Sequence, residues 1–161
     1  MFELKDKVAL ITGARRGMGR THALALSAQG AKVIVTDINE SECASVVSDI
    51  VARGGEAVAH ALDVSKGAEV EGVFDGAVKQ FGRLDILVNN AGIYFPKPAL
   101  ELTEAEWDKM LSINLKGQFL CATRAAREMA KRKWGRIINI ASVASGQVGV
   151  GISGGAHYTA S

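Results

Sequence analysis

Metal-ligand clusters, disulfide frameworks and blocks of one charge are all missing from this sequence. Its 161 residues include two cysteines, Cys43 and Cys121, and three histidines, and none of them has the spacing of a metal site. We therefore expect no bound metal and two reduced thiols. The 19 basic residues nearly balance the 17 acidic ones, so the net charge of +2 argues against a nucleic-acid partner.

Long hydrophobic runs are missing as well. Charged residues interrupt segment 1–7, and no stretch approaches the length of a signal-peptide core or of a membrane span. The content of hydrophobic residues is nevertheless 48%, which is enough to bury a sizeable core. We expect a soluble cytoplasmic protein without a membrane partner, folded as a single domain over residues 1–161.

Short apolar runs alternate with helix-compatible segments along the chain. Strands are predicted over 8–11, 31–36, 57–62, 84–88 and 136–140, and helices over 18–29, 40–53, 66–81 and from 103 to 133. Thr103 and Glu106 fit a capping box at the start of the last helix, and the glycine-rich stretch 142–155 is predicted as a loop. Because parallel strands need crossover connections, the alternation predicts a Rossmann-like doubly wound α/β fold, with helices on both faces of a parallel sheet.

A glycine-rich turn, Thr-Gly-Ala-Arg-Arg-Gly-Met-Gly over 12–19, joins the first predicted strand to the first helix. Glycines there allow a tight turn and close approach of a ligand, while the helix N-terminus offers free N–H groups to a pyrophosphate. The alternative is a tight βα turn without a ligand. Asp37 ends the second predicted strand, 18 positions after Gly19, where a carboxylate can bind the adenosine ribose hydroxyls. The two features together favour a dinucleotide site.

The same carboxylate bears on which dinucleotide binds. Asp37 would repel a 2′-phosphate, which favours NAD over NADP. Arg15 or Arg16 could pair with a 2′-phosphate, yet each could equally be solvated or contact the other phosphates. We expect NAD as the cofactor.

Further motifs follow along the chain in a recognisable order. They are Asp63-Val64 after the third predicted strand, Asn89-Asn90-Ala91-Gly92 after the fourth, Asn114 within Ile-Asn-Leu, Ser142 after the fifth, and Tyr158 near the end. Taken singly, each has an ordinary alternative as a cap, a turn residue or a surface side chain. In this order, and with the Thr-Gly-x-x-x-Gly-x-Gly spacing, the sequence resembles the short-chain dehydrogenase/reductase family over essentially its whole length.

The resemblance implies roles for individual residues. Those implied to bind the cofactor are Gly13, Arg15, Arg16, Gly17, Met18, Gly19, Asp37, Asp63, Val64, Asn90, Ala91 and Gly92. Tyr158 would be the general acid/base in hydride transfer between the nicotinamide and a secondary alcohol or ketone. Ser142 would hydrogen-bond the substrate oxygen, and Asn114 would hold a water that links the family's lysine to solvent. A free tyrosine has a pKa of about 10, so Tyr158 needs the positive charge that this lysine provides.

The sequence departs from the family pattern near its end. The lysine of the Tyr-x-x-x-Lys motif would follow Ser161 directly, and we expect the C-terminal strand and helix units of the family to be missing from this chain. Tyr158 lies 16 residues after Ser142, a spacing that suggests an insertion between 146 and 155. Ser145 is the competing serine, but strand-end placement favours Ser142.

The resemblance also implies a homo-oligomer, either a dimer or a tetramer. Two alternatives to an NAD-dependent dehydrogenase stay open. One is an NADPH-dependent reductase of the 3-oxoacyl-thioester type, and the other is a non-catalytic dinucleotide-binding module.

Overall fold

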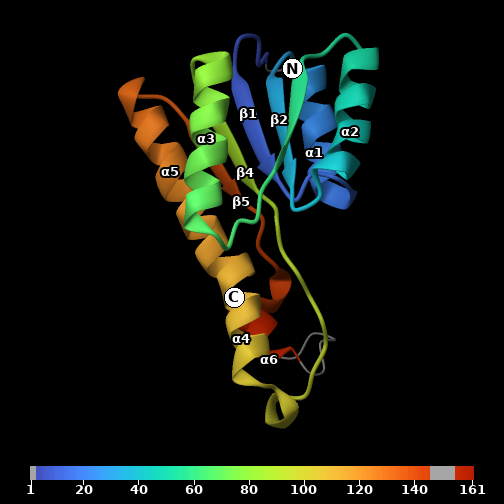
Figure 1. The fold of residues 1–161 in the computed structure, drawn as a ribbon, viewed down its shortest axis with the longest axis vertical. Coiled ribbons are helices and arrows are strands. Elements are labelled where there is room, and N and C mark those ends of the chain that lie inside the picture. Colours follow the sequence, from blue (N-terminus) through green and yellow to red (C-terminus); the bar gives the residue numbers. More distant parts are fainter. Residues whose placement is uncertain (1–2, 146–154) are drawn as a thin grey trace.

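A computed structural model describes residues 3–145 and 155–161, which form a parallel sheet between two helical layers (Figure 1). The strands are β1 (Val8–Thr12), β2 (Lys32–Asp37), β3 (Ala57–Ala61), β4 (Ile86–Asn89) and β5 (Arg136–Asn139). The helices are α1 (Gly17–Ala28), α2 (Glu40–Ala52), α3 (Gly67–Phe81), α4 (Glu104–Leu111), α5 (Gly117–Lys131) and α6 (Ala156–Thr159), with short 3-10 segments at Ala99–Glu101 and Val143–Ser145. The predicted fold class is therefore confirmed, and the insertion suggested between 146 and 155 falls almost entirely outside the described residues.

The strand order places the ligand-binding edge. The five strands are all parallel and lie in the order β3-β2-β1-β4-β5, so the direction of winding reverses between β1 and β4. In open α/β sheets, ligands bind beyond the carboxyl ends of the strands at such a reversal. The glycine turn after β1 and the Asn-Asn-Ala-Gly segment after β4 lie at this point.

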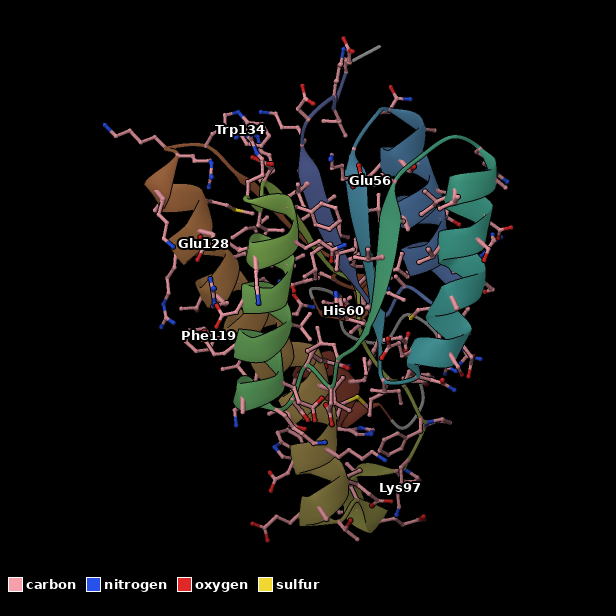
Figure 2. All side chains as sticks on the ribbon, turned by 45° about the horizontal axis from the view of Figure 1, so that its top comes forward. Glu56, His60, Lys97, Phe119, Glu128 and Trp134 are labelled. Carbon is pink, nitrogen blue, oxygen red and sulfur yellow. The ribbon has the colours of Figure 1, made fainter. Side chains whose placement is uncertain are left out.

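Alternate residues of the central strand pack on opposite helical layers. Leu10 belongs to the core beneath α3 and α5, whereas Ala9 and Ile11 belong to the core beneath α1 and α2 (Figure 1). Because both faces are covered, every residue of β1 is buried, which explains why this strand is a continuous apolar run in the sequence. His60 lies in β3 as predicted (Figure 2).

β5 forms one edge of the sheet and is exposed along its whole length. Ile137 is 37% exposed and Ile138 45%, although both have the apolar character of buried strand residues. Among the described residues, no strand pairs with the outer edge of β5. β5 is therefore an edge with exposed apolar side chains, of the kind that can pair with a further strand or another chain.

The helix predicted from 103 to 133 is interrupted. α4 and α5 are joined by a π-helical segment, Ser112–Lys116, which a periodicity argument cannot distinguish from a regular helix. The predicted capping box is confirmed, because Thr103 Oγ1 accepts from the Glu106 amide at 3.3 Å while Glu106 Oε2 accepts from the Thr103 amide at 2.9 Å. Within residues 3–145 and 155–161, no helix has the length and apolarity needed to span a membrane.

Candidate functional site

Two adjoining cavities open at the carboxyl ends of β1 and β4. The first has a volume of about 370 Å³ and the second of about 290 Å³. Their walls share five residues, namely Met18, Asn90, Ala91, Gly92 and Ile93. A ligand as long as a dinucleotide could therefore extend from one cavity into the other.

All but one of the residues predicted to bind the cofactor line the first cavity. These are Gly13, Arg15, Arg16, Gly17, Met18, Asp37, Asp63, Val64, Asn90, Ala91 and Gly92. Sequence reasoning missed Ile38, Leu62, Ile93 and Ile113, which line the same cavity. They are ordinary apolar residues in the sequence, and only the fold reveals that they border the site.

Gly19 is the exception among these residues. It is buried in the first turn of α1 and does not line the cavity. A Cβ atom built on Gly19 would lie 2.6 Å from Asn90 Nδ2, so the absence of a side chain allows α1 to pack closely against the loop after β4. Gly19 supports the cavity from behind, which matches a glycine needed for helix–strand packing.

The other glycines of the turn have distinct roles. Gly13 has φ +63°, and a Cβ there would lie 2.8 Å from Ala91 Cα, so the position needs glycine for both conformation and space. Gly17 has φ +58°, but a Cβ there would meet nothing within 4 Å. The space above Gly17 is therefore open toward the cavity.

The N-terminus of α1 is left without a cap. Arg16 occupies the N-cap position with no side-chain hydrogen bond, and the first turn contains no acidic residue. The first N–H groups and the positive end of the helix dipole consequently remain available to an anionic group of a ligand.

Thr12 joins the two loops of the site and was not among the predicted site residues. Its Oγ1 accepts from the amides of Asn90 and Ala91, both at 3.0 Å. The Asn90 side chain in turn donates to the carbonyls of Thr12 and Gly13, both at 3.0 Å. The only sequence signal for this role is the position of Thr12 directly before the first glycine.

Asp37 carries an ion pair with a residue of the glycine turn. Its Oδ1 lies 3.2 Å from Arg15 Nε and accepts from the Ile38 amide at 2.9 Å. Arg15 also donates to Glu42 Oε2 at 2.6 Å, and this hydrogen bond raises the pKa of the Arg15 guanidinium. Arg15 is therefore bound to two carboxylates at the rim of the first cavity.

Asp63 also lines the first cavity. Its Oδ1 accepts from the Ser65 amide at 3.0 Å and from Ser65 Oγ at 2.6 Å. Burial acts to raise the pKa of Asp63, but the hydrogen bonds from Ser65 and Lys66 outweigh it and lower the pKa. Asp63 is thus held as a charged acceptor, with Val64 beside it packed against Gly117 of α5.

The second cavity brings together the three predicted catalytic residues. Asn114, Ser142 and Tyr158 all line it, although they lie in the π-helical segment, after β5 and in α6 respectively. The Tyr94 ring packs edge-on against the Tyr158 ring, with 4.9 Å between centroids. Ser142 Oγ accepts from the Ala144 amide at 3.2 Å. The side chain of the competing Ser145 lies outside the part of the chain that the structure describes.

His157, next to Tyr158, does not share its position. The imidazole is fully buried, packs against the Phe95 ring with 4.7 Å between centroids and does not line the cavity. This burial favours a packing role for His157 over contact with a substrate. In the described part of the chain, no group of His, Cys, Asp and Glu side chains is placed to hold a metal ion.

Comparison with protein families and curated proteins gives one consistent result. A family model described as short chain dehydrogenase matches residues 7–161. A 3-oxoacyl-[acyl-carrier-protein] reductase of Synechocystis sp. is 43% identical over 161 residues, covering 99% of this chain and 64% of the relative. The BbsD subunit of (2S)-[(R)-hydroxy(phenyl)methyl]succinyl-CoA dehydrogenase of Thauera aromatica is 41% identical over 139 residues, covering 86% of this chain and 56% of the relative. The chain thus spans less than two thirds of either relative.

Solved structures agree with these matches. A putative short-chain alcohol dehydrogenase from Sinorhizobium meliloti superposes with a TM-score of 0.93 at 41% identity, covering 99% of this chain and 62% of that one. A metagenomic short-chain oxidoreductase in complex with NADP gives a TM-score of 0.91 at 40% identity, covering 98% of this chain and 70% of that one.

Proposed function

The chain belongs to the short-chain dehydrogenase family, and from that membership we propose that it forms the cofactor-binding and proton-transfer part of a nicotinamide-dependent oxidoreductase. The reaction would interconvert a secondary alcohol and a ketone. One observation carries the proposal: the cavity lined by Asn114, Ser142 and Tyr158 adjoins the cavity lined by the glycine turn and Asp37.

The residues of the first cavity fit a dinucleotide. The uncapped start of α1 and the open space above Gly17 suit a diphosphate, while Asp37 suits the adenosine ribose hydroxyls. Asn90, Ala91 and Gly92 border both cavities and would contact the middle of the cofactor. When bound, the nicotinamide would supply or accept the hydride at the carbinol carbon.

The residues of the second cavity would transfer a proton to or from the substrate oxygen and hydrogen-bond that oxygen. Tyr158 would donate its hydroxyl proton to the oxygen during reduction and take it back during oxidation. Ser142 would hydrogen-bond the same oxygen and stabilise the charge that develops on it. The family's lysine, which would follow Ser161 directly, would make the tyrosine proton easier to remove at neutral pH.

NAD remains our proposal for the preferred cofactor. Asp37 is only 11% exposed at its side chain and lines the first cavity, and a carboxylate beside the adenosine ribose would repel a 2′-phosphate, which disfavours NADP. The metagenomic relative solved with NADP is 40% identical, and overall similarity of this degree does not determine a preference that depends on a few side chains.

A second candidate is more specific about the substrate. The names of both curated relatives describe thioesters, one on acyl carrier protein and one on coenzyme A. This agreement favours a 3-oxoacyl or 3-hydroxyacyl thioester as substrate. If the protein is a 3-oxoacyl-thioester reductase of the type considered from the sequence, its cofactor would be NADPH. Asp37 argues against the NADPH part of this candidate.

The proposal also includes a cytoplasmic location and a homo-oligomeric state for the protein. The buried and unpaired Cys43 and Cys121 support a reducing compartment and hence the cytoplasm. Phe119 of α5 is 65% exposed (Figure 2) and Leu115, one turn earlier, is 51% exposed, an apolar pair that supports the proposed homo-oligomer.

The test uses the full-length protein, with simple ketones and 3-oxoacyl thioesters offered together with NADH or NADPH. We expect turnover with at least one pair, and a loss of about 10²- to 10⁴-fold in kcat for Tyr158→Phe with dinucleotide binding retained. Binding without turnover on any substrate would favour the non-catalytic module. No binding of either dinucleotide would refute the proposal altogether.

A further inference from the structure

Arg15 does not extend into the first cavity as an independent cation. Its guanidinium bridges Asp37, at 3.2 Å from Nε, and Glu42, at 2.6 Å from Nη1. Asp37 ends β2 and Glu42 lies in the first turn of α2, so one arginine of the β1–α1 turn is held by two carboxylates of the β2–α2 unit.

Glu42 is itself held in place. Its Oε1 accepts from Asn39 Nδ2 at 2.7 Å, which leaves Oε2 for Arg15. Asn39 Oδ1 in turn accepts from Ser41 Oγ at 2.7 Å. The first turn of α2 thus orients the Glu42 carboxylate toward Arg15, although Glu42 does not line the cavity.

The ion pairs of Arg15 with Asp37 and Glu42 determine which oxygen atoms and which net charge face a bound ligand. Asp37 Oδ1 is taken by Arg15 and the Ile38 amide, so Oδ2 remains for a ribose hydroxyl. Asp37, Glu42 and Arg15 together carry one net negative charge, which disfavours a phosphate dianion beside Asp37; Arg16 lines the same cavity but is not part of this cluster. If Arg15 were released from Glu42, its planar guanidinium could instead pair with a phosphate, as arginines commonly do.

We propose that Glu42 is a positioning residue for cofactor choice: by holding Arg15 on Asp37, it keeps the adenosine end of the site selective for a dinucleotide without a 2′-phosphate. The inference rests on the proposed function and assigns part of the NAD preference to a residue outside the cavity. Asp37 would repel the phosphate directly, whereas Glu42 would withhold the cation that could compensate for the repulsion.

The experiment measures Kd for NADH and NADPH on the full-length protein, from the change in nicotinamide fluorescence on binding. Glu42→Gln removes the charge that holds Arg15 and keeps a side chain of similar size. Glu40→Gln is the matched control, because it removes one charge from the same exposed helix turn without touching Arg15. Arg15→Met, alone and combined with Glu42→Gln, tests whether the effect depends on the arginine.

We expect Glu42→Gln to tighten NADPH binding about tenfold and to change NADH binding by less than about twofold. Glu40→Gln should change neither by more than about twofold, and the gain from Glu42→Gln should disappear in the Arg15→Met background. An unchanged NADPH Kd, an equal gain in both glutamate variants, or a gain that persists without Arg15 would each overturn the inference while leaving the proposed function intact. Failure of the unmodified protein to bind either dinucleotide would overturn both.

Discussion

The side-chain amide of Asn114 lies along the main chain of Ile93 and bonds to both of its peptide groups. Asn114 Oδ1 accepts from the Ile93 amide at 2.9 Å, and Asn114 Nδ2 donates to the Ile93 carbonyl at 3.0 Å. The amide therefore satisfies both main-chain hydrogen-bonding groups of Ile93, which lies beyond the end of β4. It ties the π-helical segment to the loop that forms the wall between the two cavities.

This relationship predicts the effect of Asn114→Ala. Asn114 is 7% exposed, and the substitution removes its hydrogen bonds to two part-buried main-chain groups of Ile93. We expect a loss of about 2–3 kcal/mol in the free energy of unfolding and at least about tenfold in kcat, because the loop between the cavities shifts. Chemical denaturation and steady-state kinetics would measure the two effects.

Ser112→Ala is the control for Asn114→Ala. Ser112 is in the same π-helical segment, but its hydroxyl makes a local contact with the Lys109 carbonyl at 2.9 Å on the exposed side. Its removal should change stability by less than about 0.5 kcal/mol. Equal effects of the two substitutions would show that the π-helical segment, rather than the contact with Ile93, is what matters.

Substitution of glycine by alanine should have opposite effects on stability at Gly19 and at Gly72. Gly19→Ala would push against the Gly13 carbonyl, the nearest atom, and against Asn90, since a Cβ there would lie 2.6 Å from Asn90 Nδ2, and it should cost about 1–3 kcal/mol of stability. Gly72 lies within α3, and a Cβ atom at this position would meet nothing within 4 Å, so Gly72→Ala should stabilise the protein by about 0.5–1 kcal/mol. Thermal unfolding of both variants checks the pair, and a neutral Gly19→Ala would refute the close packing of α1 on the loop after β4.

The sequence predicted those parts of the site that depend on local spacing. The turn over 12–19 and Asp37 lie at strand ends, and strand ends of a parallel sheet converge on one edge whatever the details of packing. For the same reason Ser142, placed at the end of β5, lines the cavity with Tyr158. The capping box was predictable because its contacts span only three residues.

The parts that could not be predicted depend on contacts between distant segments. Nothing in the spacing indicates that Arg15 pairs with Glu42, because that contact requires the start of α2 to lie beside the β1–α1 turn. The position of Gly19 behind the cavity and the contact of Asn114 with Ile93 likewise follow from how helices pack on loops. The π-helical segment escaped because its residues keep the composition of an ordinary helix.

Glu106 predicts a pH dependence of stability. Lys97, labelled in Figure 2, donates to both Glu106 carboxylate oxygens at 2.7 and 2.8 Å, and this contact together with the Thr103 hydrogen bonds lowers the pKa of Glu106 to about 2. Since the pKa is lower in the folded state than its ordinary value of 4.5, the contribution to stability is complete above about pH 4.5 and is lost as pH falls toward 2. The measurement is the free energy of unfolding as a function of pH, for the unmodified protein and for Glu106→Gln.

The two unfolding curves should differ by a constant amount from pH 5 to 7 and converge below about pH 4.5. Glu104→Gln provides the comparison, since Glu104 lies in the same first turn of α4 but makes no ion pair with Lys97. A pH-independent difference for Glu106→Gln would mean that shape, rather than charge, accounts for the role of Glu106 at the start of α4.

The two cysteines predict a chemical test of the fold. Burial raises the pKa of the Cys121 thiol to about 12, and burial together with the nearby Asp37 raises the pKa of the Cys43 thiol to about 11. At pH 8 a pKa of about 11 leaves only about one thiolate in a thousand, and the thiolate is the reactive form. Native protein should therefore react with an aromatic disulfide reagent at least about 100-fold more slowly than protein in denaturant, with Cys43 the faster of the two. The Cys43→Ser variant retains Cys121 alone, so its labelling rate shows which of the two rates belongs to each thiol. Rapid labelling of Cys121 in the native protein would show that the core between α5 and the sheet opens far more readily than its packing implies, since this thiol can react only when that core opens.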